Sequence, residues 1–403
     1  MRILIVCDFF LKYGAQQARS LARMNHDVAI LCRSHAFEFG GHPGERDELL
    51  TGARLDGVRL FVVPYRIRSS RAVPAVLEIR RALRRWRPDV VQVHRNHDPR
   101  LLALTAGYRT VLTVHDPVDH PGAVVLKRWA NRADKQWFRR ADRFVVHGPA
   151  LAAELAPLVD PRRIAVIPHG VSPHSEPLPC PESPTVLLFG RLEEYKGVEV
   201  LVEATRLVWE QRPDVRLVVA GTGPAARHVP EDPRVLLIPR YIAESEVDDL
   251  FAEASLVVLP YTQASQSGVG GLAIAAGVPV VVSNLGALPE LAYEPSFTVE
   301  AGNPGALADT MLRHLDDGPE VRSAVLRHAQ SHFSWDRAAR LSTQLYRGLI
   351  AQNARDGNHA SDRSARRLTS FNERPSNRDV AILPSSARAR WYWIPGSRRR
   401  RPS

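Results

Sequence analysis

Short runs of apolar, mostly β-branched residues recur along most of the chain, and helical or loop-like stretches separate most of them. Seven of these runs lie within residues 1–171, and a further five lie between residues 186 and 282. Continuous apolar strands that alternate with helices are typical of parallel sheets with both faces covered. The pattern therefore predicts an α/β protein of two doubly wound domains, which suits a length of 403 residues.

A proline-rich segment divides the two sets of strands. Residues 173–184 hold five prolines in 12 positions, where neither a helix nor a central strand is favoured. We therefore expect an N-terminal domain over residues 1–172, a linker over 173–184 and a C-terminal domain over 185–335. Helical periodicity continues over residues 336–352 and then fails.

Most of the net charge of +11 lies at the end of the chain. From Arg355 onward there are 12 arginines and four acidic residues, so the remainder is nearly balanced. This segment is also rich in Ser, Asn and Pro, and we expect residues 353–403 to form a disordered, Arg-rich tail. Apart from the aromatic triplet at 391–393, the tail lacks residues on which bases could stack, so nucleic acid is not expected as a partner.

The overall composition is that of a globular protein, with 44% apolar and 24% charged residues. No run approaches the roughly 20 apolar residues of a membrane-spanning helix. The apolar start is shorter than the core of a signal peptide and lacks a cleavage pattern, so we interpret it as a first strand. The three cysteines are widely spaced, which fits reduced thiols in a cytoplasmic protein and neither disulfides nor a zinc site.

The segment VLLFGRLEEYKG at residues 186–197 ends a strand and carries two cations, Arg191 and Lys196, before a helical pattern begins. A guanidinium and an ammonium group suit the two phosphates of a nucleotide diphosphate. The alternative is a pair of solvated surface cations. The chain has only four lysines against 50 arginines, so a lysine at position 196 favours a specific role for its ammonium group.

A second loop of small polar residues, 265–271, follows a later strand and precedes an Ala-rich helix. Backbone amides and hydroxyls of Ser267, Gly268 and Val269 could hold phosphate or sugar oxygens at the start of this helix. A loop of small residues that serves only close packing is the alternative. Gly221 also follows a strand, but Pro224 breaks the dinucleotide fingerprint.

Two residues of the first half stand just after strands, where open α/β sheets bind ligands. His115 follows the strand at 110–114, and Gly14 lies in the loop after the first strand. A structural histidine and an ordinary turn glycine are the alternatives. His94, His97 and Asp98 end another strand, but we do not expect them to bind a metal. Motifs of P-loop, zincin and hydrolase chemistry are absent from the sequence.

These segments together resemble retaining glycosyltransferases of family 4, which have the GT-B fold of two Rossmann-like domains facing a cleft. The resemblance covers most of residues 1–349. It is carried by MRILIVCDFFLKYGAQQARSLAR, TVHDPVDHPG, RRADRFVVHG, IAVIPHGV, VLLFGRLEEYKGVEVLVEA, LVVAGTGP, PVVVSNLGALPEL and FSWDRAARLSTQLY.

The resemblance implies sugar transfer from a nucleotide-diphosphate sugar to an acceptor hydroxyl of a glycan, lipid or small molecule, with retention and without a metal or cofactor. His115, Arg191 and Lys196 would be the catalytic residues, with His115 beside the sugar or acceptor. The N-terminal domain would hold the acceptor, and the terminal helix would cross back to it. The donor-binding residues would be Gly14, Arg191, Lys196, Gly221, Ser267, Gly268 and Val269.

One departure from the family pattern concerns the donor. Aligned on AAGVPVV, the two glutamates usual in the second loop are replaced by Ala264 and Leu272. In the usual pattern the first contacts the donor sugar and the second the ribose. The segment SQSGV is similar to a Gln-Ser-Gly variant of the family. The alternative function is a GT-B protein that binds a nucleotide sugar without catalysis.

The segment PAVLEIRRALRRWR at residues 74–87 predicts an amphipathic helix. Its apolar stripe would pack on the sheet, and its arginines would face outward. Because acceptors in the resembled family are often lipid-linked, peripheral contact with an anionic membrane is a further expectation. The arginine run at 398–401 could reinforce such contact.

Overall fold

The computed structural model describes seven stretches of the chain, namely residues 1–8, 10–35, 37–39, 43–64, 72–94, 98–115 and 128–360. Residues Met1–Gln352 form one compact unit. The expected disordered tail beyond residue 360, with its aromatic triplet and arginine run, lies outside the described residues, and so does His97.

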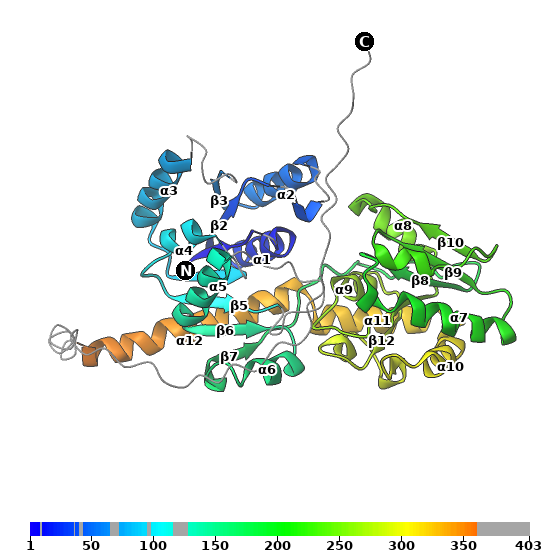
Figure 1. The fold of residues 1–403 in the computed structure, drawn as a ribbon. Helices are drawn as coiled ribbons and strands as arrows, with labels where there is room; N and C mark the ends of the chain where they lie inside the picture. Colours follow the sequence, from blue (N-terminus) through cyan, green and yellow to red (C-terminus); the bar gives the residue numbers. More distant parts are fainter. Residues whose placement is uncertain are drawn as a thin grey trace, which may run out of the picture. The chain divides into compact units, whose positions relative to one another are not determined.

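In the part of the chain that the structure describes, the first sheet has seven parallel strands in the order β3-β2-β1-β4-β5-β6-β7 (Figure 1). Its strands are β1 (Arg2–Val6), β2 (Asp27–Arg33), β3 (Arg59–Val63), β4 (Val90–His94), β5 (Thr110–Thr113), β6 (Arg143–Val146) and β7 (Ile164–Val166). Strand β1 is central, with Val6 aligned to Leu31 on one side and to Val93 on the other. The order reverses between β1 and β4, which is the place where sheets of this kind bind ligands.

Helices cover both faces of this sheet because successive side chains of each strand point to opposite faces. In β1, Ile3 and Ile5 belong to one apolar cluster with α1 and α2, while Leu4 and Val6 belong to another with the helices after β3 and β4. The helices are α1 (Leu11–Arg23), α2 (Pro43–Leu55), α3 (Ala72–Trp86), α4 (Pro99–Leu104), α5 (Arg128–Arg140) and α6 (Pro149–Leu155), with short 3-10 turns η1 (Phe37–Phe39) and η2 (Pro161–Arg163).

The second sheet has six parallel strands in the order β10-β9-β8-β11-β12-β13. They are β8 (Thr185–Phe189), β9 (Arg216–Ala220), β10 (Val235–Ile238), β11 (Leu256–Leu259), β12 (Val280–Ser283) and β13 (Thr298–Val299). Its α-helices are α7 (Val198–Gln211), α8 (Val247–Ala252), α9 (Gly268–Ala275), α10 (Pro304–His314) and α11 (Pro319–His332). Short 3-10 helices join them: η3 (Glu194–Lys196), η4 (Pro224–His228), η5 (Glu244–Glu246), η6 (Leu288–Glu290) and η7 (Pro295–Phe297).

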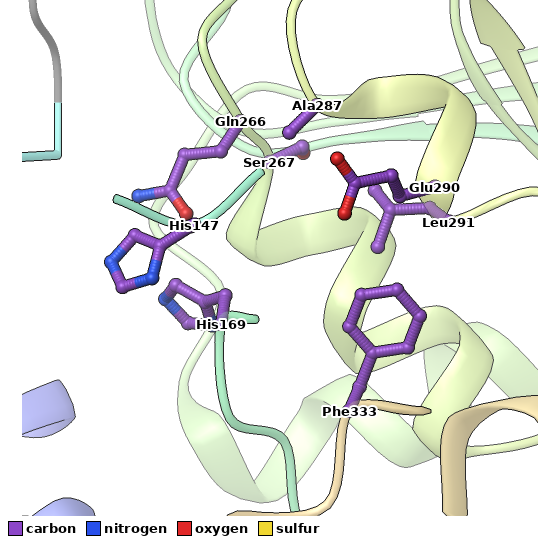
Figure 2. Close-up of a pocket in the computed structure, with 8 residues that line it drawn as sticks. All are labelled: His147, His169, Gln266, Ser267, Ala287, Glu290, Leu291 and Phe333. Carbon is purple, nitrogen blue, oxygen red and sulfur yellow. The ribbon is translucent and has the colours of Figure 1, made fainter. Parts of the chain in front are cut away.

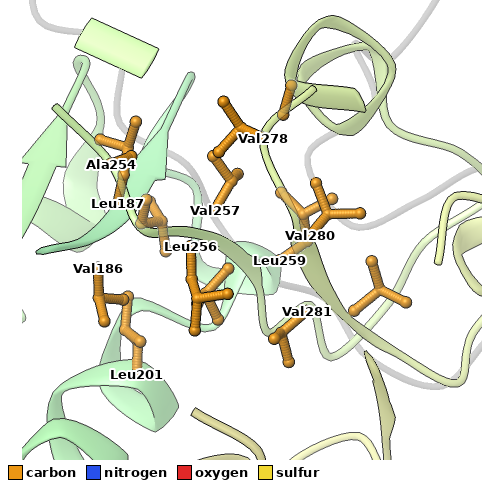
Figure 3. Packing of buried hydrophobic residues seen from close by; sticks show 14 of the residues in the cluster. Val186, Leu187, Leu201, Ala254, Leu256, Val257, Leu259, Val278, Val280 and Val281 are labelled. Carbon is orange, nitrogen blue, oxygen red and sulfur yellow. The ribbon is translucent and has the colours of Figure 1, made fainter. Parts of the chain in front are cut away.

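The core of the second sheet is aliphatic. Figure 3 shows Val186 and Leu187 of β8 beside Leu256 and Val257 of β11, with Val281 of β12 close by. These five side chains are at most 1% exposed. Such burial fixes the strand order, so the ends of β8 and β11 lie side by side, and the loops that follow them are brought together.

The last helix, α12 (Trp335–Ala360), packs against the first sheet although it follows the second in sequence. Trp335, Ala338 and Tyr346 belong to the same apolar cluster as Ile3 and Ile5. The Tyr346 hydroxyl donates to Gln92 Oε1 of β4 over 3.0 Å. The two parallel sheets confirm the predicted α/β fold. Within the described ranges, no helix is both long and apolar enough to cross a bilayer.

Candidate functional site

The loop after β8 presents Arg191 and Lys196 at the carboxyl edge of the second sheet. Arg191 is exposed, whereas Lys196 is half-buried in the turn before α7. The Lys196 Nζ donates a hydrogen bond of 2.6 Å to the Tyr261 hydroxyl, which lies just past β11. The two predicted cations therefore belong to one edge, and Lys196 is tied to the loop after β11.

The second predicted loop is connected to the same tyrosine. The Tyr261 hydroxyl lies 3.0 Å from Ser267 Oγ, and Ser267 Oγ accepts from the backbone N–H of Gly270 over 3.3 Å. Ser267 is thereby the N-cap of α9. A helix start carries about half a positive charge and backbone N–H groups that suit an anion. Lys196, Tyr261 and Ser267 thus join the two loops in one hydrogen-bonded chain.

Burial changes the acid–base behaviour of this chain. Desolvation lowers the pKa of Lys196 to about 8, with a further lowering by the neighbouring charge of Arg191. Desolvation also raises the pKa of Tyr261 to about 12, so the phenol stays neutral. A bound anion would favour the charged ammonium form that burial disfavours. Lowered lysine pKa values of this kind are common at functional sites.

Gly268 and Val269 form the first turn of α9, and Gly221 lies beneath the loop of Arg191. Val269 is half-buried against Gly190. A Cβ on Gly268 would meet no atom within 4 Å. Gly221 has φ +135°, and a Cβ there would lie 1.8 Å from the carbonyl oxygen of Gly190. Close backbone packing therefore explains why position 221 is a glycine. Its contact with a donor stays a prediction.

In the first sheet, His115 lies just past β5 and is 1% exposed. Its Nε2 is 3.2 Å from His94 Nδ1, and its Nδ1 is 3.2 Å from His147 Nε2. Gln266 Nε2, from the loop of Ser267, is 3.3 Å from the same Nδ1. The ring of Phe10 stacks on His115 with 3.8 Å between centroids. His115 is therefore part of a buried group of polar rings.

The structure corrects the expected position of Gly14. The residue was predicted in the loop after β1, but it lies in the first turn of α1, where its N–H donates to the Phe10 carbonyl over 2.9 Å. A Cβ at Gly14 would lie 2.5 Å from Cys7 Sγ. Glycine here lets α1 begin close to the end of β1, which explains why the helix starts earlier than the sequence suggested.

A small pocket lies beside these groups (Figure 2). The Glu290 carboxylate is turned toward the side of the pocket that holds Ser267. Desolvation raises the pKa of Glu290 to about 7. The pocket is lined by His147, His169, Gln266, Ser267, Ala287, Glu290, Leu291 and Phe333. It combines an amide, a hydroxyl, imidazoles and a carboxylate, the groups that bind sugar hydroxyls.

Ala264 and Leu272 stand where the resembled family usually has glutamates. Ala264 is half-buried, and the Leu272 side chain is 48% exposed. Neither position offers a carboxylate to a ligand. Among the residues that the structure describes, no group of three or more His, Cys, Asp or Glu side chains is arranged to hold a metal ion.

Comparisons with known protein families agree with the division of the chain into two sheets. The family model described as "Glycosyltransferase Family 4" matches residues 12–175, and that described as "Glycosyl transferases group 1" matches residues 183–317. The chain belongs to glycosyltransferase family 4. The two matched segments of this family 4 chain contain every strand of the two sheets except β1, and they leave out the last helix.

Two relatives of this family 4 chain carry names of glycosyltransferases. A D-inositol 3-phosphate glycosyltransferase of Corynebacterium glutamicum is 31% identical over 43% of this chain and 45% of its own length. The alignment thus spans less than half of that relative. A phosphatidyl-myo-inositol mannosyltransferase of Propionibacterium freudenreichii is 28% identical over 83% of this chain and 92% of its own length.

Solved structures show that the fold is GT-B. The structure of Anabaena HepE in complex with UDP-glucose matches with a TM-score of 0.62. The match covers 86% of this chain and 99% of HepE at 16% identity. The predicted GT-B fold of this family 4 chain is confirmed.

Several residues at these edges were not among the predicted site residues. Tyr261 follows β11, and His147 follows β6. Gln266 lies inside the predicted loop, and Glu290 lies in the turn after β12. Their common signal is a polar side chain just past a buried strand, but the sequence does not show which of these side chains point toward one another.

Proposed function

We propose that the protein transfers a sugar from a nucleotide-diphosphate sugar to an acceptor hydroxyl, with retention of configuration and without a metal. The observation that carries the proposal is the hydrogen-bonded chain of Lys196, Tyr261 and Ser267, which brings a cation to the start of α9. Both features attract a diphosphate. Membership in family 4 supports the same activity.

In this mechanism the second sheet binds the diphosphate of the donor. Arg191 and Lys196 offset the negative charge that grows on the leaving diphosphate as its bond to the sugar breaks. Ser267 Oγ already accepts from Gly270 N–H and can accept from the neutral Tyr261 hydroxyl, so its own hydrogen is available to a phosphate oxygen. The acceptor hydroxyl attacks from the face that the diphosphate leaves, which retains the configuration.

The first sheet would supply the acceptor side. His115 lies next to Gln266, and Gln266 lines the pocket that also contains Ser267. We therefore propose that His115 contacts the transferred sugar or the acceptor. Gly14 allows α1 to begin close to the end of β1. It thereby keeps Phe10, which stacks on His115, at this edge of the first sheet.

The donor and the acceptor are proposed by class. Anabaena HepE, which shares the fold, was solved in complex with UDP-glucose, and this favours a nucleotide-diphosphate hexose as donor. The relatives are named for inositol phosphate and for phosphatidyl-myo-inositol, which favours a hydroxylated polar or lipid-linked acceptor. No cofactor is proposed beyond the donor itself.

A panel of UDP-, GDP- and ADP-sugars with polyol, glycan and lipid-linked acceptors tests the proposal. We expect release of nucleotide diphosphate with at least one pair. Lys196→Ala should lower that rate by about 100-fold, because loss of one preorganised contact with developing charge costs about 3 kcal/mol of barrier. Lys135→Ala, at an exposed position on α5, is the matched control. Equal rates in both variants would refute the role of Lys196.

Non-catalytic binding of a nucleotide sugar is the second candidate, and the replaced carboxylates at Ala264 and Leu272 favour it. A nucleotide sugar would then raise the melting temperature and would never be consumed. Consumption with any acceptor decides for catalysis.

We further propose peripheral contact with anionic membranes through α3. Its residues Ile79, Leu83 and Trp86 are buried against the first sheet. Four arginines of α3 are exposed, namely Arg80, Arg81, Arg84 and Arg85. Its apolar residues Val73 and Leu77 are exposed as well. Vesicles with anionic lipid should therefore carry the protein in flotation, and replacing these arginines with glutamine should abolish it. Equal binding to neutral vesicles would overturn the proposal.

A further inference from the structure

Three buried histidines lie in series at the carboxyl edge of the first sheet. His94 ends β4, His115 follows β5 and His147 follows β6, and all three side chains are at most 2% exposed. His94 Nδ1 and His115 Nε2 are 3.2 Å apart, and His115 Nδ1 and His147 Nε2 are also 3.2 Å apart. The three adjacent strands thus hold the rings in one hydrogen-bonded chain.

Each end of this chain has a fixed partner. His147 Nδ1 lies 3.0 Å from the carbonyl oxygen of Ile167, and His94 Nε2 lies 2.9 Å from Oε1 of Gln17 on α1. The ring of Tyr13 packs against all three imidazoles, with centroid distances of 5.0 to 5.4 Å. The chain is closed at both ends and covered by an aromatic ring.

The carbonyl at one end fixes the first hydrogen, and the remaining directions follow if the rings are neutral. A carbonyl only accepts, so His147 Nδ1 must carry the hydrogen. If the ring is neutral, its Nε2 accepts, and His115 Nδ1 must then donate to it. His115 Nε2 in turn accepts from His94 Nδ1–H. Burial disfavours the charged form of an imidazole, and desolvation lowers the pKa of His94 to about 3.

The two side-chain amides distinguish the neutral chain from its protonated form. The structure places Gln17 Oε1 at His94 Nε2 and Gln266 Nε2 at His115 Nδ1. The neutral chain requires both amides in the flipped orientation, with the Gln17 NH2 group at His94 and the Gln266 oxygen at His115 Nδ1–H, and oxygen and nitrogen of an amide are exchanged by such a flip without moving the other atoms. Gln266 Oε1 is buried and otherwise lacks a hydrogen-bond partner, and in this orientation it shares the His115 Nδ1–H with His147 Nε2. With both amides as the structure places them, His115 Nδ1 accepts, so a hydrogen bond from His147 Nε2 would require His147 to be an imidazolium.

We propose that His94 and His147 are positioning residues that hold His115 in its Nδ1–H tautomer. Gln266 lines the pocket and contacts Nδ1, whereas His94 occupies Nε2. On the side of the ring that meets Gln266, His115 therefore carries an N–H, shared with His147, and not a lone pair, so it would not act on a substrate there as a base. This consequence rests on the proposed sugar transfer, but the tautomer itself does not.

Long-range proton–nitrogen NMR spectra of the full chain, labelled with 15N-histidine, test the tautomer at pH 7. Single His→Asn variants assign the signals. We expect His94, His115 and His147 to show the pattern of a neutral ring with the hydrogen on Nδ1. An Nε2–H pattern for His115, or an imidazolium pattern for His147, would overturn the proposal. The result is obtained whether or not a donor and acceptor are known.

A matched pair of variants tests positioning. In His94→Asn, the amide can still donate to His115 Nε2, whereas the carboxylate of His94→Asp can only accept. We expect the Asn variant to keep the Nδ1–H signal of His115 and the Asp variant to move the hydrogen to Nε2. With an active donor pair, kcat should fall at least tenfold in the Asp variant alone, with little change in KM. The same His115 signal in both variants would show that His94 does not set the tautomer.

Discussion

The depressed pKa of Lys196 predicts that binding of a nucleotide diphosphate takes up a proton. With a pKa of about 8, about half of the Lys196 amines are neutral at pH 8. A diphosphate beside the amine should raise that pKa by about two units, in the range that a close opposite charge produces. Uptake should therefore be about 0.1 proton per site at pH 7, about 0.5 at pH 8 and about 0.8 at pH 9.

Calorimetric titration with UDP, GDP and ADP, in two buffers of different ionisation enthalpy, measures this uptake. Lys196→Arg is the matched control, because it keeps the charge but does not titrate in this range. The pKa of Glu290 is about 7, and any uptake by this carboxylate remains in the control and is subtracted. If uptake at pH 8 and 9 is the same in the wild type and in Lys196→Arg, the lysine does not meet the diphosphate.

The lowered pKa of Lys196 also means that its buried ammonium group, which favours nucleotide binding, lowers the free energy of unfolding. The pKa of Lys196 is lower in the folded protein than the ordinary 10.5, so the unfolded chain binds more protons between these values. Its contribution to the free energy of unfolding therefore rises from pH 8 to about 10.5. At pH 7, Lys196→Met should raise this free energy, by up to about 3 kcal/mol, while it weakens nucleotide binding.

Two further predictions concern single side chains of the second sheet. Tyr261→Phe removes the hydroxyl between Lys196 and Ser267 and should weaken nucleotide binding about tenfold, the effect of about one hydrogen bond; calorimetry that shows unchanged affinity would contradict the connection. Gly221→Ala should lower the free energy of unfolding by more than about 3 kcal/mol in urea, because a Cβ there meets the Gly190 carbonyl at 1.8 Å. Gly44→Ala, in open space on α2, should change it by less than about 1 kcal/mol, and equal losses in the two variants would refute the packing argument.

The two parallel sheets could be predicted from the sequence because their strands are almost wholly apolar. The runs at Val186 and Leu256 are buried on both faces, which leaves no other arrangement than a sheet covered by helices. Arg191, Lys196 and Ser267 could also be predicted as site residues from the sequence, because each follows a strand or precedes a helix.

The contacts between loops could not be predicted in the same way. Tyr261 is one tyrosine among nine, and only the strand order brings its hydroxyl between Lys196 and Ser267. The start of α1 was missed because nothing in the local pattern shows that Gly14 packs against Cys7. The chain of histidines depends on three strands that are adjacent in space and separated by long stretches of sequence.

A thermal-shift panel tests whether a nucleotide sugar binds at the edge formed by Arg191, Lys196 and the start of α9. UDP-, GDP- and ADP-sugars are compared on the wild type, on Arg191→Ala/Lys196→Ala and on Lys135→Ala. We expect at least one sugar nucleotide to raise the melting temperature of the wild type and of Lys135→Ala, and we expect the double variant to lose this shift. No shift with any of the three donors, or an equal shift in the double variant, would contradict it.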